Sequence, residues 1–142
     1  MLAYTGNVRD RDWNRLSYQM GARMNTQNQI TKIEQPLIPA PPEGYTDHFR
    51  DPQVIPYQGG YLLIIGAQTV QEEGKVLVYQ GDTYTNWQLL GELDYMPAQA
   101  GYMVECPNLV FIKEQPVLIF CPQGMAKEDV AYQNIYPNTF VV

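Results

Sequence analysis

The sequence predicts an all-β fold made of propeller-like blades, each with four antiparallel strands. Three observations predict it. Short runs of alternating or β-branched apolar residues recur along the chain between turn residues, and helix signals are nearly absent. The sequence matches itself at a spacing of 55 residues, which is the distance from Pro52 to Pro107. Four strands in about 40 to 50 residues form the unit of a propeller blade.

The first 38 residues predict the end of one blade. Strands are expected at residues 2–5, 17–23 and 30–33, the last two joined by an Asn-rich turn. We expect the chain to begin inside a blade, so that these are its later strands. Residues 36–44 are rich in proline, which lacks the amide hydrogen that a central strand must donate. This segment is a stiff surface linker, a loop that leads into the inner strand of the next blade, or both.

Residues 49–93 predict one complete blade. Its inner strand begins after Pro52, and further strands are expected at residues 61–65, 75–79 and 88–93. The turns between them are marked by Gly59-Gly60, Glu73-Gly74 and Gly81-Asp82.

Residues 102–142 predict the start of the next blade, with strands at residues 109–112 and 117–120. Antiparallel counting about a turn at Glu114-Gln115 brings Cys106 and Cys121 close to facing each other. A disulfide is one outcome. Two reduced, buried thiols are the outcome that we expect, because a reducing compartment keeps thiols unpaired.

The composition excludes several classes of function. The chain has 142 residues, a formal net charge of -6 at pH 7 and 45% hydrophobic residues, which is typical of a folded soluble protein. Nine scattered basic residues argue against a nucleic-acid surface. No apolar stretch reaches the length of about 18 residues that would span a bilayer, and no secretory signal opens the chain, so we expect a cytoplasmic protein. Two cysteines and one histidine make a poor metal site, and no cofactor is expected.

Charged residues stand before the aligned prolines of the repeat. Arg50-Asp51 precedes Pro52, and Glu105-Cys106 precedes Pro107. The inner strands of successive blades run along one axis, so Arg50 and Glu105 are candidates for a shared site. The alternative is a simple ion pair between blades, which contributes little if exposed. Regular alternation would send Arg50 and Asp51 to opposite faces, although the following proline favours an irregular strand entry.

Two segments closely resemble signature motifs of glycoside hydrolase family 32, the β-fructofuranosidases that include invertases and bacterial sucrose-6-phosphate hydrolases. They are His48-Phe49-Arg50-Asp51-Pro52 and Tyr102-Met103-Val104-Glu105-Cys106-Pro107. The resemblance extends over essentially the whole chain and is closest to the bacterial sucrose-6-phosphate hydrolase branch. Flanking segments that also look like this family are Tyr4-Thr5-Gly6-Asn7, Asp12-Trp13-Asn14, Pro41-Pro42-Glu43-Gly44-Tyr45 and Tyr132-Gln133-Asn134.

The resemblance implies a partial five-bladed β-propeller of about two blades. It implies a glycosidase site that cleaves the β-fructofuranosyl bond of sucrose or sucrose 6-phosphate with retention of configuration. Glu105 maps onto the family's acid/base, and Asp51 onto the aspartate that binds fructosyl hydroxyls and stabilises the transition state. Arg50 maps onto the arginine that anchors the pocket by hydrogen bonds. One acid that protonates the leaving oxygen, together with hydroxyl contacts that tighten as an oxocarbenium-like centre develops, suits this chemistry.

The sequence also departs from the family. The nucleophile motif, Trp-Met-Asn-Asp-Pro-Asn-Gly, has no counterpart here, and Val104 stands where many relatives carry tryptophan. We therefore expect an internal fragment of the propeller domain that is inactive alone. The alternative is a noncatalytic propeller fragment that binds sugar or protein. Uncovered sheet edges predict a homo-oligomer, which sedimentation would test.

The remaining candidates have simpler interpretations. His48 is expected to be a structural hydrogen bonder, and Cys106 a packed thiol without an activating base. Trp13 and Trp87 are possible sugar platforms, but Trp87 falls in an outer strand, where core packing is favoured.

Overall fold

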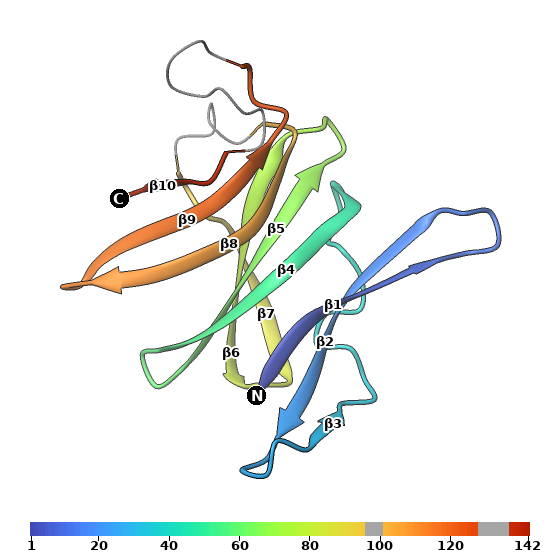
Figure 1. Ribbon diagram of the computed structural model, residues 1–142, viewed down its shortest axis with the longest axis vertical. Coiled ribbons are helices and arrows are strands. Elements are labelled where there is room, and N and C mark those ends of the chain that lie inside the picture. The colour runs from blue at the N-terminus through green and yellow to red at the C-terminus, as the bar shows by residue number, and fades with distance from the viewer. Residues whose placement is uncertain (96–100, 128–136) are drawn as a thin grey trace.

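The computed structural model describes residues 1–95, 101–127 and 137–142. These residues form ten strands and no helix, so no helix among them can span a membrane (Figure 1). The strands are β1 (Leu2–Arg9), β2 (Arg15–Met24), β3 (Ile30–Lys32), β4 (Tyr45–Tyr57), β5 (Gly60–Thr69), β6 (Gly74–Thr83), β7 (Asn86–Glu92), β8 (Met103–Ile112), β9 (Gln115–Gln123) and β10 (Thr139–Val141).

The strands make three antiparallel sheets, with the orders β1-β2-β3, β4-β5-β6-β7 and β10-β9-β8. Each range expected as a strand lies within an observed strand or extends at most one residue beyond it, but most observed strands are longer, and β4 begins at Tyr45 rather than after Pro52. The prediction of an all-β, partial propeller is confirmed. Strand β10 had not been expected, and its three residues follow a part of the chain outside the described residues.

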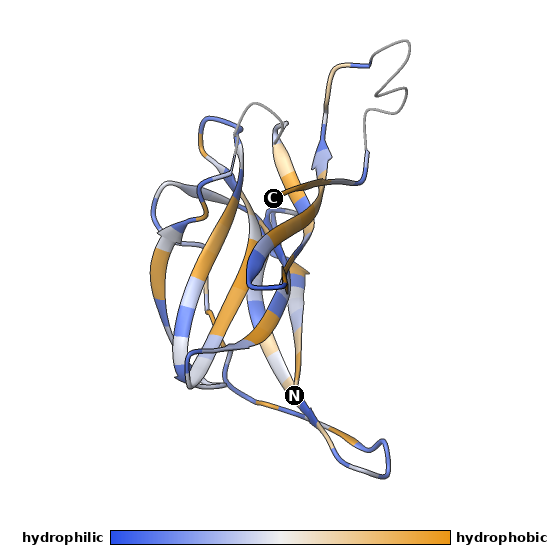
Figure 2. Ribbon diagram, turned by 90° about the vertical axis from the view of Figure 1, so that its left-hand side faces the viewer, coloured by the Kyte–Doolittle hydropathy of each residue, from blue (hydrophilic) through white to orange (hydrophobic). Residues whose placement is uncertain are grey.

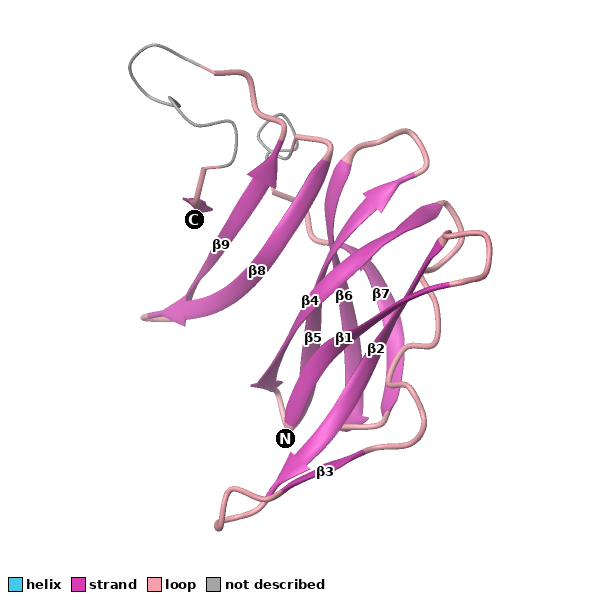
Figure 3. Ribbon diagram, turned by 45° about the vertical axis from the view of Figure 1, so that its right-hand side comes forward, coloured by secondary structure: helices cyan, strands magenta, loops and turns pink. Residues whose placement is uncertain are grey.

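The sheets lie side by side in chain order (Figure 3). Strand β4 of the second sheet packs against β1 and β2 of the first sheet, and β8 of the third sheet packs against β4 and β5. The strands that open the three sheets therefore come close to one another, and residues far apart in the sequence meet there.

Strand β5 of the second sheet is buried on both faces. Alternate residues of β5 enter two apolar clusters, with Leu62 and Ile64 in one, and Leu63 and Ile65 in the other. The first cluster includes Leu109 and other residues of the third sheet. Long hydrophobic stretches follow the strands, and hydrophilic residues predominate at the turns (Figure 2). Burial on both faces fixes the register of β5, because a shift by one residue would exchange its two faces.

Candidate functional site

A β-bulge interrupts β4 at its charged motif. Between Arg50 and Gln53, two residues of β4 stand opposite one residue of β5. The first of the two, Asp51, has a φ of 62°, in the left-handed region that few residues other than glycine and Asn or Asp adopt. The bulge breaks the alternation of side chains, so Arg50 and Asp51 can both reach the next inner strand. Regular alternation, which would place the two side chains on opposite faces of the sheet, therefore does not apply here.

The same bulge occurs on β8. Between Glu105 and Asn108, two residues of β8 stand opposite one residue of β9. The first of the two, Cys106, has a φ of 49°. The sequence repeat is therefore a repeat of backbone geometry: a charged residue, then a left-handed residue, then a proline.

Arg50 and Glu105 form an ion pair between the second and third sheets. The Nε and Nη2 atoms of Arg50 donate to Oε1 of Glu105 at 2.9 and 2.7 Å. Oε2 of Glu105 accepts from the side-chain amide of Gln123. The Arg50 and Glu105 side chains are 15% and 30% exposed, so this pair is shielded from water more than an ordinary surface pair.

Asp51 joins the inner strands of all three sheets. Its Oδ2 accepts the backbone N–H of Cys106 at 2.9 Å. Its own backbone N–H donates to Oγ1 of Thr5, on β1, at 2.9 Å. In each bulge, the backbone N–H of the left-handed residue thus donates to a side chain on the inner strand of the preceding sheet. Sequence reasoning missed Thr5, although Tyr4-Thr5-Gly6-Asn7 had already been noted as typical of the family.

A hollow of about 500 Å³ opens at this junction. Asp51 lines it, whereas Arg50 and Glu105 do not belong to its lining and lie directly before the two bulges. The hollow is therefore assembled from β1, β4 and β8. Its other lining residues are Ala3, Tyr4, Thr5, Pro52, Gln53, Cys106, Pro107 and Asn108.

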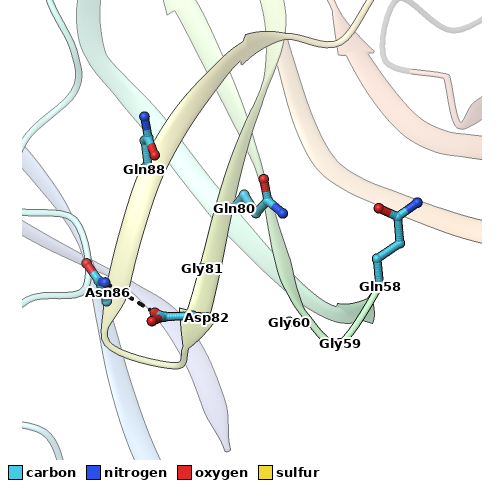
Figure 4. A pocket seen from close by; sticks show the side chains of 8 residues that line it. All are labelled: Gln58, Gly59, Gly60, Gln80, Gly81, Asp82, Asn86 and Gln88. Carbon is cyan, nitrogen blue, oxygen red and sulfur yellow. Dashed lines mark hydrogen bonds between the residues drawn. The ribbon is translucent and has the colours of Figure 1, made fainter.

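A second hollow, of about 410 Å³, lies at the β4–β5 and β6–β7 turns (Figure 4). Side-chain amides and glycine backbone line it, and Asp82 is its one acidic residue. Asn86 donates to Asp82 at 3.2 Å. Asp51 and Cys106 line the hollow at the bulges, whereas none of the site residues predicted from the sequence lies in this second hollow. The lining residues are Gln58, Gly59, Gly60, Gln80, Gly81, Asp82, Asn86 and Gln88.

His48 accepts a hydrogen bond at the site. Nη1 of Arg50 lies 3.0 Å from His48 Nδ1, and because arginine can only donate, the His48 proton lies on Nε2. Burial, followed by the nearby Arg50 and Arg15 charges, lowers the pKa of His48 from its ordinary 6.5. His48 is therefore neutral at pH 7.

Cys106 is exposed, so the expectation that both thiols are buried was wrong for this residue. The bulge causes the difference, because it turns Cys106 out of the regular alternation of β8. Both cysteines are free, and Cys121 faces Glu105 across the hairpin. Burial, then the Asp51 charge, raises the pKa of Cys106 to about 11, so its thiol is protonated and unreactive at neutral pH.

The other sequence candidates lie away from the hollow. Val104 is fully buried in the apolar cluster between the second and third sheets. Trp87 packs against the other cluster, and Trp13 is 77% exposed. The described ranges contain no group of three or more His, Cys, Asp or Glu residues placed to hold a metal ion.

Comparison with known proteins gives consistent results. The sequence model of the Glycosyl hydrolases family 32 N-terminal domain matches residues 1–142. A sucrose-6-phosphate hydrolase of Pediococcus pentosaceus is 55% identical over 142 residues, which are 99% of this chain and 28% of the relative. One from Lactococcus lactis subsp. lactis is 48% identical over 143 residues, covering 99% of this chain and 30% of the relative. The chain thus spans less than a third of the length of these relatives.

Solved structures agree with the sequence relatives. The structure of sucrose-6-phosphate hydrolase from Lactobacillus gasseri superposes with a TM-score of 0.89 at 48% identity, covering 98% of this chain and 28% of that one. A variant of the Bombyx mori GH32 beta-fructofuranosidase BmSUC1, solved in complex with sucrose, has a TM-score of 0.80 at 27% identity and covers 98% of this chain and 30% of its own.

Proposed function

Because the chain belongs to glycosyl hydrolase family 32, as part of its N-terminal domain, we propose that it supplies the acid/base and one sugar-binding wall of a β-fructofuranosidase site. The observation that supports this most directly is the pair of matching bulges. They bring Arg50 to Glu105 and Asp51 to Cys106 from consecutive sheets, beside a hollow that is open to solvent.

Glu105 acts as the acid/base. It gives its proton to the glycosidic oxygen as the bond from that oxygen to the fructosyl carbon breaks, and the glucosyl part departs as an alcohol. A nucleophilic carboxylate then holds the fructosyl group. In the second step Glu105 takes a proton from the attacking water, and the fructosyl–enzyme bond is hydrolysed.

Asp51 and Arg50 have supporting roles. Asp51 is the carboxylate that faces the hollow, where it can accept hydrogen bonds from fructosyl hydroxyls that strengthen as the oxocarbenium-like centre develops. Arg50 holds Glu105 through Oε1, whereas Gln123 donates to the other carboxylate oxygen, Oε2.

The 142 residues alone do not complete a turnover under this proposal. Retaining hydrolysis needs a nucleophilic carboxylate about 5 to 5.5 Å from the acid. The family's nucleophile motif is missing from the sequence, and Asp51 already accepts the Cys106 amide and serves the sugar hydroxyls.

We further propose that the substrate carries the 6-phosphate. Several cations gather on the Glu105 side of the site: Arg9 and Arg15 pair across the β1–β2 hairpin. Burial, followed by the Arg50 and Arg9 charges, lowers the pKa of Arg15. Clustered cations favour an anion, and arginine suits phosphate in particular. The names of the bacterial relatives support the same choice.

The test is hydrolysis of sucrose and sucrose 6-phosphate by the 142-residue chain and by the complete protein that carries it. The complete protein should hydrolyse the phosphorylated sugar faster, and the chain alone should hydrolyse neither. Glu105→Gln in the complete protein should lower kcat by about a thousandfold, since general acid catalysis contributes roughly 10² to 10⁴. Unchanged turnover in this variant would refute the role of Glu105, and Arg15→Gln without effect on the preference would refute the phosphate assignment.

A further inference from the structure

Glu105 belongs to a ring of residues that are linked one to the next by hydrogen bonds and that join the second and third sheets. Within His48 and Tyr102, the ring passes from the backbone to the side chain. On one side, the backbone N–H of His48 donates to Oγ1 of Thr46 at 3.1 Å. The Thr46 hydroxyl donates to Oε1 of Gln68 at 3.0 Å, and Nε2 of Gln68 donates to the backbone carbonyl of Tyr102 at 2.9 Å. Tyr102 stands three residues before Glu105 on the neighbouring sheet.

The other side returns through Glu105. The Tyr102 hydroxyl donates to Oε1 of Gln123 at 3.3 Å, and the amide nitrogen of Gln123 donates to Oε2 of Glu105. Arg50 donates to Oε1 of Glu105 and, through Nη1, to His48, which closes the ring. Glu105 receives hydrogen bonds from both directions and gives none.

Gln123 belongs to a module that the fold uses three times. In each sheet a hydroxyl from the region of the first strand donates to Oε1 of a glutamine on the second: Thr5 to Gln19 at 3.0 Å, then Thr46 to Gln68, then Tyr102 to Gln123. The first two glutamines pass their amide N–H to a backbone carbonyl of the next sheet. Gln123 instead directs its amide to a side-chain carboxylate, Glu105. The acceptor of the Gln123 amide is therefore the candidate acid itself.

The backbone near Gln123 is shaped for this arrangement. Gly101 and Gly124 have φ values of 60° and 74°. A Cβ on Gly101 would overlap the carbonyl of Gln123, and a Cβ on Gly124 would overlap the ring of Tyr102. The backbone N–H of Tyr102 also donates to the carbonyl of Gln123 at 2.9 Å. The two glycines thus allow Tyr102 and Gln123 to pack closely, and Gln123 in turn contacts Glu105.

The contacts also restrict where Glu105 can carry its proton. An ionised carboxylate has about four lone-pair sites. Arg50 occupies two of them on Oε1, and Gln123 occupies one on Oε2. The remaining site is on Oε2, which makes that atom the candidate for proton exchange with the substrate.

We propose that Gln123 is a positioning residue that holds the Glu105 carboxyl so that the open site of Oε2 meets the leaving-group oxygen. This inference rests on the proposed function of Glu105. Without Gln123, the partly exposed Glu105 side chain gains rotational freedom, and misplacement of an acid by about 1 Å can cost roughly a hundredfold in rate.

The test uses Gln123→Met in the complete protein, with Gln115→Met, an exposed position on the same strand, as the matched control. Gln123→Met should lower kcat on sucrose 6-phosphate by about 10- to 100-fold and leave KM within about twofold. The loss should shrink on a nitrophenyl β-fructofuranoside, whose leaving group departs without a proton. The control should change neither value. Tyr102→Phe, which removes only the hydroxyl, should cause a smaller loss with the same dependence on the leaving group.

Three outcomes would overturn the proposal. Equal losses on both substrates, or a rise in KM with kcat unchanged, would make Gln123 a structural link like Gln19. Additive effects of Gln123→Met and Glu105→Gln on the free energy of unfolding would deny the contact itself. Failure of the proposed function is a separate result, because it would appear as activity that survives Glu105→Gln whatever residue stands at position 123.

Discussion

The bulges of β4 and β8 have the same backbone but opposite chemistry. Each has a charged residue, a left-handed residue and a proline in sequence. In β4 these carry a guanidinium and a carboxylate, whereas in β8 they carry a carboxylate and a thiol. The charged groups pair across the gap, and the carboxylate at the left-handed position of β4 accepts the N–H at the left-handed position of β8. The repeated backbone geometry places the side chains at equivalent positions, and the different residue types at these positions then give the two bulges different chemical roles.

The two regions also differ on the strands beside them. Gly66 pairs with Arg50, and Cys121 occupies the matching place opposite Glu105. A Cβ on Gly66 would overlap the backbone carbonyl of Val104, on the next sheet. Gly66 is therefore the residue that lets the third sheet approach the second closely enough for the pairs to form.

The largest effect on this comparison is expected from Gly66→Ala. The obstructing atom belongs to backbone that cannot rotate away, so the variant should lose about 3 kcal/mol of the free energy of unfolding, at the upper end of overpacking costs. It should also separate Arg50 from Glu105. Chemical denaturation measures the loss, and Cys121→Ala is the matched control, expected to change stability by less than about 1 kcal/mol. Equal effects of the two changes would mean that the sheets do not depend on this approach.

Much of this comparison could be predicted from the sequence. The spacing from Pro52 to Pro107 gave the repeat, and Arg50, Asp51 and Glu105 were singled out before their contacts were known. Pro52 had favoured an irregular strand entry, but the left-handed conformation at Asp51 and Cys106 could not be predicted, because it depends on pairing with the neighbouring strand.

The glutamine module was missed although it had a signal. Gln68 and Gln123 stand 55 residues apart, the same spacing as the prolines. A polar residue inside an apolar strand shows only that a partner must exist. The identity of that partner depends on how the sheets pack against one another, and the alternation of residues along one strand does not reveal this packing.

A second prediction concerns the thiol of Cys106, a residue that is exposed as a whole although nearby protein atoms partly exclude water from its sulfur. This partial desolvation first, and the Asp51 charge second, raise its pKa from 9.0 to about 11. At pH 8 its thiolate fraction, and hence its rate of alkylation by iodoacetamide, should be about a hundredfold below that of a thiol with the ordinary pKa. Raising the pH towards 11 should recover the rate.

Asp51→Asn separates the two causes of this shift. The change removes the negative charge but keeps an oxygen that can accept the Cys106 N–H, so the pKa should fall part of the way and alkylation at pH 8 should speed up. Mass spectrometry in a Cys121→Ser background follows Cys106 alone. An alkylation rate of Cys106 that is unchanged by Asp51→Asn would show that the two bulges are not electrostatically coupled.

The smallest of the three effects tests the left-handed position itself. Asp51→Ala places a residue that disfavours a φ of 62° in the bulge and removes the acceptor of the Cys106 N–H, which together should cost about 1.5 kcal/mol of the free energy of unfolding. Asp51→Asn should cost less than about 0.5 kcal/mol, because asparagine tolerates this conformation and still accepts. Cys106→Ala, at the matching position of β8, keeps the same backbone demand but removes only a weak thiol contact, so it should resemble Asp51→Asn in stability. If Cys106→Ala were as costly as Asp51→Ala, the carboxylate would not distinguish the two bulges in stability, and the division of roles between them would have to be sought elsewhere.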